Sequence, residues 1–261
     1  MRTDAGGWLR IYTERADAPQ KLVVLPHGGG SASYYRSFAK SFPSSVEVAV
    51  VQYPGREDRI GEDPLITMAS LVDELAPRLA RYADRGTSMF GHSMGASVGY
   101  EVARRLERLW GLRIGLLVVS GRPGPVHQEQ GLKHRDDDVL WAELGRLGGT
   151  DSRMLESSVL REALLPVLRA DYTLVETYSA TFGPELTVPI AACGGQDDPE
   201  VEPWKLKSWA EVTTGPFSSR TFPGEHFYLT SDAMNDVVRW VSDHLAGSAQ
   251  PKPYPPGGQL S

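Results

Sequence analysis

Residues Gly91–Gly95, with the sequence GHSMG, constrain the fold of this chain more than any other feature. A short apolar run, Thr87–Phe90, precedes them, and a helical pattern over Ala96–Leu106 follows. A strand, a G-x-S-x-G turn and a helix in this order are typical of a nucleophile elbow, in which a strained turn exposes the serine. The alternative interpretation is a small-residue turn without chemistry. The flanking strand and helix favour the elbow, with Ser93 as nucleophile.

Strand-like and helix-like segments alternate along most of the chain. The predicted strands are Leu9–Tyr12 (a short edge strand), Lys21–Leu25, Val46–Val51, Thr87–Phe90, Ile114–Ser120, Val188–Gly194 and Phe217–Phe222. The predicted helices are Tyr34–Phe42 (capped by Ser33), Met68–Asp84, Ala96–Leu106, Val139–Leu147, Val159–Thr177, Trp204–Val212 and Ser231–Leu245. Such alternation predicts parallel pairing with right-handed crossovers, and therefore an α/β fold whose mostly parallel central sheet is flanked by helices.

This alternation is interrupted once. Residues 122–186 contain helical patterns but no clear strand, and they fall between two late strands of the predicted sheet. Ligands bind at the carboxyl edge of such sheets, so the segment is predicted to be a helical lid over that edge. Asp137 or Asp138 is expected to cap its first helix. We therefore predict one domain over residues 1–246 that contains this insertion, and a flexible Pro- and Gly-rich tail at 247–261.

The elbow requires a base and an acid further along the chain, in the order serine, acid, histidine. His226 fits the base, because it lies in a loop between the last predicted strand and the last helix; a surface-loop histidine is the alternative. Two adjacent carboxylates, Asp197 and Asp198, follow the preceding strand, and they cannot both face the imidazole. The turn pattern with the acid before proline favours Asp198, which leaves Asp197 as a turn residue.

The predicted α/β-hydrolase arrangement implies acyl transfer through a serine. His226 would take the Ser93 proton, and Asp198 would orient the imidazole. Two backbone N–H groups must stabilise the oxyanion: Met94, after the nucleophile, and Gly28, in the HGGG sequence at 27–30. A phosphate cradle is the alternative for these glycines, but no Lys-Ser/Thr pair follows them. This chemistry requires no metal and no cofactor.

Composition narrows the classes of partner. A net charge of −6 over 261 residues disfavours nucleic acid, because binding phosphates takes a basic face. The single cysteine, Cys193, excludes an internal disulfide and a multi-cysteine metal site. The N-terminus has no signal-like apolar segment, and no apolar run approaches the ~20 residues of a membrane span. We expect a cytoplasmic, monomeric protein that binds neither nucleic acid nor membrane.

With these motifs the chain resembles the type II thioesterases that accompany polyketide and nonribosomal peptide synthases. The resemblance covers nearly the whole chain, and it departs from the family pattern at Gly28, where members often carry alanine. It rests on LPHGGGSA at 25–32, QYPGREDR at 52–59, FGHSMGA at 90–96, SGRP at 120–123, LGGT at 147–150, LPVLRADY at 165–172, GQDDP at 195–199 and GEHFYL at 224–229.

The resemblance implies hydrolysis of acyl thioesters on the phosphopantetheine arm of acyl or peptidyl carrier proteins, which removes stalled or misprimed units from a synthase. Some of the basic residues in loops expected near the mouth are candidates to bind that arm or an acidic carrier surface; solvated surface charge is the alternative. These residues are Arg56, Arg59, Arg122, Lys133 and Arg135. The apolar side chains expected to wall an acyl chamber, or simply to pack the lid on the sheet, are Leu140, Trp141, Leu144, Leu147, Leu164, Leu165, Leu168, Tyr172 and Leu174.

Two other functions remain open at this level. A general carboxylester or acyl-CoA hydrolase would use the same triad, because esters and thioesters pass through similar tetrahedral intermediates. A non-catalytic, synthase-binding module of the hydrolase fold is disfavoured, since binding alone would not require Ser93, Asp198 and His226 together.

Overall fold

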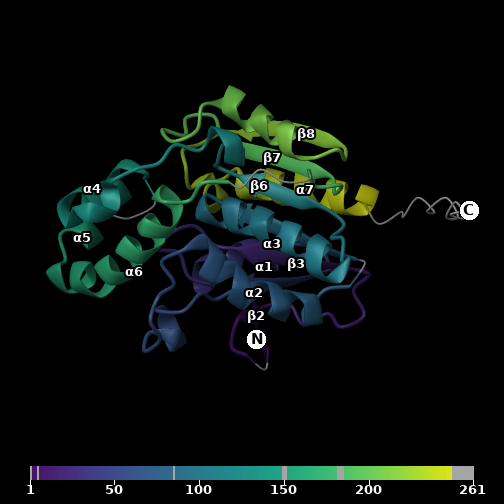
Figure 1. The fold of residues 1–261 in the computed structure, drawn as a ribbon, viewed down its shortest axis with the longest axis horizontal. Coiled ribbons are helices and arrows are strands. Elements are labelled where there is room, and N and C mark those ends of the chain that lie inside the picture. Colours follow the sequence, from purple (N-terminus) through teal and green to yellow (C-terminus); the bar gives the residue numbers. More distant parts are fainter. Residues whose placement is uncertain (1, 5, 85, 149–151, 181–184, 249–261) are drawn as a thin grey trace, which may run out of the picture.

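A single eight-stranded sheet runs through the part of the chain that the computed structural model describes, residues 2–4, 6–84, 86–148, 152–180 and 185–248. The strand order is β1-β2-β4-β3-β5-β6-β7-β8 (Figure 1). The strands are β1 Arg2–Thr3, β2 Leu9–Ile11, β3 Gln20–Leu25, β4 Val46–Val51, β5 Thr87–His92, β6 Leu117–Ser120, β7 Ile190–Gly195 and β8 Phe217–Phe222. Strands β1 and β2 pair antiparallel, as do β2 and β4, and all later pairings are parallel.

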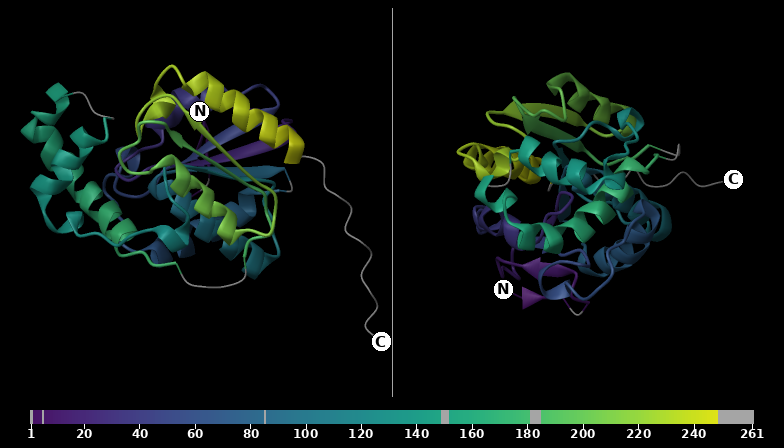
Figure 2. Two further views of the ribbon diagram at one scale, coloured as in Figure 1. Left: turned by 90° about the horizontal axis from the view of Figure 1, so that it is seen from above. Right: turned by 90° about the vertical axis from the view of Figure 1, so that its left-hand side faces the viewer.

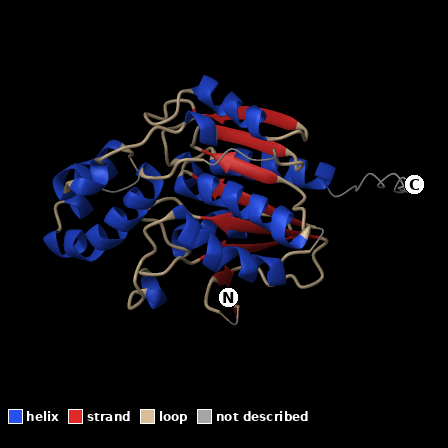
Figure 3. Cartoon of the chain, viewed as in Figure 1, coloured by secondary structure: helices blue, strands red, loops and turns tan. Residues whose placement is uncertain are grey.

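Helices cover both faces of this sheet, and the alternation of side chains along each strand explains why (Figure 3). In β3, Val23 and Leu25 pack with one apolar cluster, whereas Leu22 and Val24 pack with the other. The first cluster includes α2 (Met68–Tyr82) and α3 (Met94–Trp110), and the second includes α1 (Arg36–Lys40) and α7 (Met234–Ser248). The predicted mostly parallel sheet, flanked by helices, is confirmed.

The segment between β6 and β7 holds α4 (Asp137–Arg146), α5 (Ser152–Leu155) and α6 (Ser158–Glu176). These helices lie together beyond one end of the sheet, apart from the helices on its faces (Figures 1 and 2). The shorter 3-10 helices are η1 Ser33–Tyr35, η2 Glu57–Arg59, η3 Pro125–His127, η4 Lys133–Arg135, η5 Pro203–Val212 and η6 Tyr228–Thr230. We call residues 122–180 of this segment the lid.

Several local predictions were wrong. The strand at Leu9–Ile11 is not at the edge, because β1 pairs along its outer side. Ser33 does not cap a helix; it begins η1, and its hydroxyl bonds to Glu57 instead. The cap of α4 is Asp136, whose Oδ1 accepts the N–H of Asp138 at 2.9 Å. Of the three consecutive aspartates, Asp136 has the extended backbone, with φ of −137° and ψ of 117°, that an N-cap residue adopts.

Other predictions shift or cannot be placed. The segment Trp204–Val212 is 3-10 rather than α-helical, and the strands predicted from Ile114 and Val188 begin later, at Leu117 and Ile190. Part of the LGGT sequence, at 149–150, lies outside the described residues. So does the predicted tail from residue 249 onward.

Candidate active site

Ser93 lies in a strained turn between β5 and α3. Its φ of 53° and ψ of −117° fall where non-glycine residues are rare. A Cβ at Gly91 would overlap the carbonyl oxygen of Gly95, and a Cβ at Gly95 would overlap that of Leu25. Glycine is therefore required at both positions, and the strand, turn and helix predicted around GHSMG are confirmed.

An aspartate and a histidine form a buried pair above this turn. Asp198 follows β7 and His226 follows β8, so neighbouring strand ends bring the two side chains together. His226 Nδ1 lies 2.9 Å from Asp198 Oδ2 and 3.1 Å from Oδ1. Asp197 is exposed, and its backbone N–H donates to the carbonyl of Gly224. The structure therefore selects Asp198 as the carboxylate that faces the imidazole.

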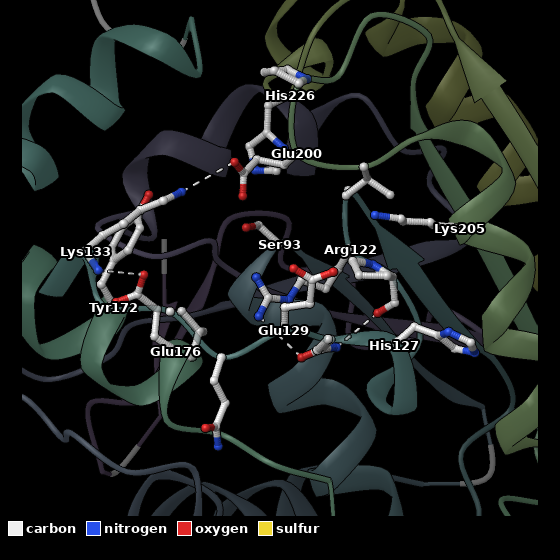
Figure 4. Close-up of a pocket in the computed structure, with 18 residues that line it drawn as sticks. Ser93, Arg122, His127, Glu129, Lys133, Tyr172, Glu176, Glu200, Lys205 and His226 are labelled. Atoms are coloured by element: carbon white, nitrogen blue, oxygen red, sulfur yellow. Dashed lines mark hydrogen bonds and ion pairs between the residues drawn. The ribbon is translucent and has the colours of Figure 1, made fainter.

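Ser93 and His226 line the same cavity, of about 310 Å³, between the sheet end and the lid. Figure 4 shows Ser93 near its middle, with Lys133 and Tyr172 on one side and Arg122 and Lys205 on the other. The charged residues of the lining are Arg122, Lys133, Lys205, Glu129, Glu176 and Glu200. The cavity wall is therefore largely polar next to the serine.

Two further buried histidines lie near the pair: His92 beside His226, and His27 beside His92. The His92 ring centroid lies 4.9 Å from that of His226, and the His27 ring 5.9 Å from that of His92. Burial lowers the pKa of His27 to about 3, with smaller effects of His226 and Arg56, and burial also lowers the pKa of His92. His27 Nδ1 lies 2.7 Å from the Tyr35 hydroxyl, so His27 braces the loop after β3.

The HGGG loop packs on the elbow. A Cβ at Gly95 would lie 2.8 Å from the carbonyl oxygen of Pro26, so the loop and the turn touch. Gly29 adopts a φ of 76°, and its N–H donates to Asp171 Oδ2 at 2.6 Å. The Gly30 N–H donates to the carbonyl of His27 at 3.0 Å. Of the three glycines, Gly28 is thus the one whose N–H is not taken up by these contacts.

The lid contributes less apolar surface to the cavity than the sequence suggests. Of the nine side chains expected to wall an acyl chamber, Tyr172 lines the cavity, beside Val175 and Glu176 of the same helix. Leu140, Leu168 and Leu174 are almost fully buried instead, and Leu174 belongs to the apolar cluster on one face of the sheet. The alternative interpretation, packing of the lid on the sheet, is therefore correct for Leu174.

The positions expected for Arg56 and Arg59 were wrong. Both side chains are buried, at 5% and 7% exposure, rather than at the cavity mouth. Arg56 pairs with Asp171 and donates to the Pro54 carbonyl at 2.8 Å. Arg59 pairs with Glu62 and donates to a backbone carbonyl at 2.7 Å. Buried guanidinium groups need such partners, so neither is free to meet a carrier.

Some residues of the site were not identified from the sequence as functional, notably Asp171, Glu176 and Glu200. Glu176 accepts the backbone N–H groups of Lys133 and His134 at 3.0 and 2.9 Å, which ties η4 to α6. A signal for Asp171 was available. It lies on the apolar stripe of α6, one helical turn after Leu168, where a charged residue must find a partner.

The described residues limit the other chemistries of the chain. Within them, no group of three or more His, Cys, Asp or Glu side chains is arranged to hold a metal ion. Nor does any described helix have the length and apolar character needed to cross a membrane.

A mostly parallel sheet with a serine elbow, followed by an Asp–His pair on later strand ends, defines an α/β hydrolase. The thioesterase-domain family matches residues 20–245 of the chain. Thioesterase PikA5 of Streptomyces venezuelae is 40% identical over 247 residues, which are 94% of this chain and 88% of that protein.

Solved structures agree with this match. The type II thioesterase BorB, from the borrelidin biosynthetic cluster, has a TM-score of 0.85 at 38% identity and covers 94% of this chain and 99% of its own. YbtT, a type II thioesterase of the yersiniabactin NRPS/PKS pathway, has a TM-score of 0.83 at 28% identity, with 93% and 100% covered. The chain therefore belongs to the thioesterase family. It is a thioester hydrolase of the α/β-hydrolase type, and the family resemblance seen in the sequence is confirmed.

Proposed function

We propose that this thioesterase hydrolyses acyl groups from the phosphopantetheine arm of acyl or peptidyl carrier proteins, and so removes stalled or misprimed units from a polyketide or nonribosomal peptide synthase. Its similarity to type II thioesterases such as BorB and YbtT supports this substrate class. The observation that carries the chemistry is that Ser93, on its strained turn, shares a cavity with the Asp198-bonded His226.

In the proposed reaction His226 Nε2 accepts the proton of the Ser93 hydroxyl as Oγ attacks the thioester carbonyl. The tetrahedral intermediate then expels the pantetheine thiolate, which takes the proton back from the imidazolium. Water, deprotonated by His226, attacks the acyl-enzyme, and the imidazolium returns this proton to Ser93 Oγ as the carboxylic acid is released. Asp198 holds the proton on Nδ1 and stabilises the imidazolium through its short contacts.

The oxyanion is proposed to be bound by the N–H groups of Gly28 and Met94. Met94 is the first residue of α3, where an N–H has no partner within the helix. Gly28 is supported by elimination, since the neighbouring N–H groups of Gly29 and Gly30 donate elsewhere. Donors of this kind are worth a few kcal/mol each, by order of magnitude.

Arg122 replaces Arg56 and Arg59 as the proposed contact for the arm or its acyl group. Its side chain lines the cavity with Ser93, and its buried Nε has no partner among the described residues. The substitution Arg122→Gln should raise the KM for pantetheine thioesters more than for a nitrophenyl ester, which lacks the arm. Equal changes for both substrates would show that Arg122 does not contact the arm.

Mass spectrometry of carrier proteins loaded with different acyl units tests the proposal. Incubation with the enzyme should return the free phosphopantetheine form, and Ser93→Ala should abolish this turnover by several orders of magnitude, about 10⁴-fold or more. Parallel assays with acyl-CoA and nitrophenyl esters identify a general hydrolase, which would turn these over as well as acyl carriers. Deacylation that survives Ser93→Ala would contradict the assigned nucleophile.

A further inference from the structure

Asp171 is a lid residue whose side chain contacts the loops after β3 and β4. It lies on α6 with 3% of its surface exposed, and its carboxylate bonds to two residues outside the lid. Oδ2 accepts the backbone N–H of Gly29 at 2.6 Å and also pairs with the guanidinium of Arg56. The two partners belong to the loops after β3 and β4.

The loop that receives this contact is shaped by the lid helix. Gly29 has a φ of 76°, and a Cβ there would lie 2.6 Å from Cδ2 of Leu168, one helical turn before Asp171. At Gly28 the nearest group to a Cβ would be Cβ of Asp171 itself, at 3.5 Å. Helix α6 therefore packs directly on the two glycines. The Asp171 carboxylate holds the Gly29 N–H in a hydrogen bond within the protein, where it would otherwise bond to water.

Arg56, in the loop after β4, holds the Asp171 carboxylate through Oδ2, the same oxygen that accepts the Gly29 N–H. Its Nη1 donates to the Pro54 carbonyl at 2.8 Å, and its guanidinium lies 5.2 Å from the Tyr53 ring centroid. Gln52 joins the same two loops, because its Oε1 accepts the Ala32 N–H at 2.7 Å and its Nε2 donates to the Arg56 carbonyl at 3.0 Å. The β3 loop, the β4 loop and α6 thus form one buried polar network.

We infer that Asp171 is a positioning residue, which fixes the Gly29 peptide from the lid so that the Gly28 N–H points at the thioester oxygen. The inference rests on the proposed oxyanion hole. It means that the position of α6 on the core sets the strength of the oxyanion hole, so a lid displaced from the loop leaves Ser93 and His226 in place but stabilises the tetrahedral intermediate poorly. The contacts of Arg56 orient the Asp171 carboxylate for this role.

The variant Asp171→Asn tests this, with Asp137→Asn as its matched control. Asp137 is also a lid aspartate paired with an arginine, Arg169, but that pair is on the surface. Active sites are counted by titration with a fluorophosphonate, and kcat is expressed per titrated site. We expect kcat to fall by roughly 10- to 100-fold for Asp171→Asn with little change in KM, because oxyanion contacts act in the transition state. Asp137→Asn should keep the wild-type kcat.

A second readout separates positioning from folding. A boronic acid forms a tetrahedral adduct with the serine, so its inhibition constant should rise with the same factor by which kcat falls. If Asp171→Asn folds poorly, the double variant Arg56→Met/Asp171→Leu removes both buried charges together and should show the same loss. A wild-type kcat per titrated site in either variant, or a change in KM alone, would overturn the inference. The proposed function is tested separately by wild-type deacylation and Ser93→Ala.

Discussion

Two parts of the active site are held in place by different forces. One is the lid, and the other, which we call the floor, is the sheet end with the Ser93 turn and the loops after β3 and β4. The floor rests on sheet residues with no exposed surface, such as Val23 and Phe90, and on backbone contacts so close that side chains are excluded. The lid joins the main apolar cluster near the end of α6, through Leu174 and Val175, whereas its leading part belongs to neither sheet cluster.

Ion pairs connect that leading part to the core. Arg146 and Lys133 form ion pairs with Glu200, two residues after Asp198, and Asp171 pairs with Arg56. Apolar packing against a sheet is nearly insensitive to salt. The two pairs with Glu200 are partly exposed, and such pairs are weak and screened by salt, whereas the Arg56–Asp171 pair is buried. The comparison therefore indicates a rigid catalytic floor beneath a lid whose attachment depends on electrostatics.

The largest expected difference between the two regions is in the free energy of unfolding that is lost when a glycine is replaced by alanine. Gly95→Ala should lower the free energy of unfolding by about 3 kcal/mol or more, because the new Cβ would meet backbone of Leu25. Gly145→Ala, in α4, should change it by about 1 kcal/mol or less, since the nearest group is the flexible Leu155 side chain at 3.1 Å and alanine favours a helix. Urea unfolding followed by circular dichroism measures both. Equal losses would contradict a rigid floor and a tolerant lid.

As the pH falls, the contribution of the floor to stability should be lost before that of the lid. The pKa of His27 is lowered to about 3 by burial, below its ordinary 6.5, so the unfolded state binds protons first as pH falls below 6.5. Stability is thus fully present above pH 6.5 and is lost toward pH 3, by at most ~1.4 kcal/mol per pH unit for this histidine. The lid carboxylate of Glu143 is desolvated, but its bonds to Arg146 and Lys133 outweigh burial and lower its pKa, so its contribution is lost only below about pH 4.5.

Unfolding free energies at pH 7 and pH 5 measure this order. The variant His27→Gln should show a shallower decline over that interval than the wild type. Asp137→Asn, on the exposed lid surface, should leave the decline unchanged. A decline that is the same in all three proteins would exclude His27 as its source.

The smallest expected effect concerns the ion pairs at the lid edge. Glu200→Gln removes one acidic partner of Arg146 and Lys133, which also pair with Glu143, but keeps the backbone N–H that Asp198 accepts at 2.8 Å. Because these groups are partly exposed, stability should fall by less than about 1 kcal/mol, and the difference should vanish in high salt. Glu202→Gln, which breaks the pair with Lys205, is the control. A loss above about 2 kcal/mol that persists in salt would show that the pair is buried in solution.

Local patterns predicted much of the floor correctly. The order of strands and helices, the elbow at Ser93 and the place of His226 between the last strand and the last helix follow from periodicity, glycine spacing and chain order, which can be read along the sequence. The sequence favoured Asp198 over Asp197 only through its turn pattern. The structure shows which carboxylate faces His226, because Asp198 bonds to its imidazole and Asp197 is exposed. Details such as the cap at Asp136 were missed because neighbouring aspartates offer the same chemistry.

The lid was predicted least well. Arg56 looked like a surface cation because nothing near it in the sequence suggests a partner, and Asp171 lies 115 residues further along the chain. Burial of the lid leucines likewise depends on which helices pack together, as with α4 against α6. Contacts between residues so far apart in the chain leave no recognisable pattern in the sequence around either one.

The sequence by itself determined the α/β-hydrolase arrangement with a serine elbow, because tight turns and buried strands impose residue types at fixed spacing, and its resemblance to type II thioesterases indicated the family. Only the tertiary structure decided how the lid meets the catalytic loops. That contact depends on a buried pair, Arg56 and Asp171, whose members are uninformative apart and are costly to bury unless folding brings them together.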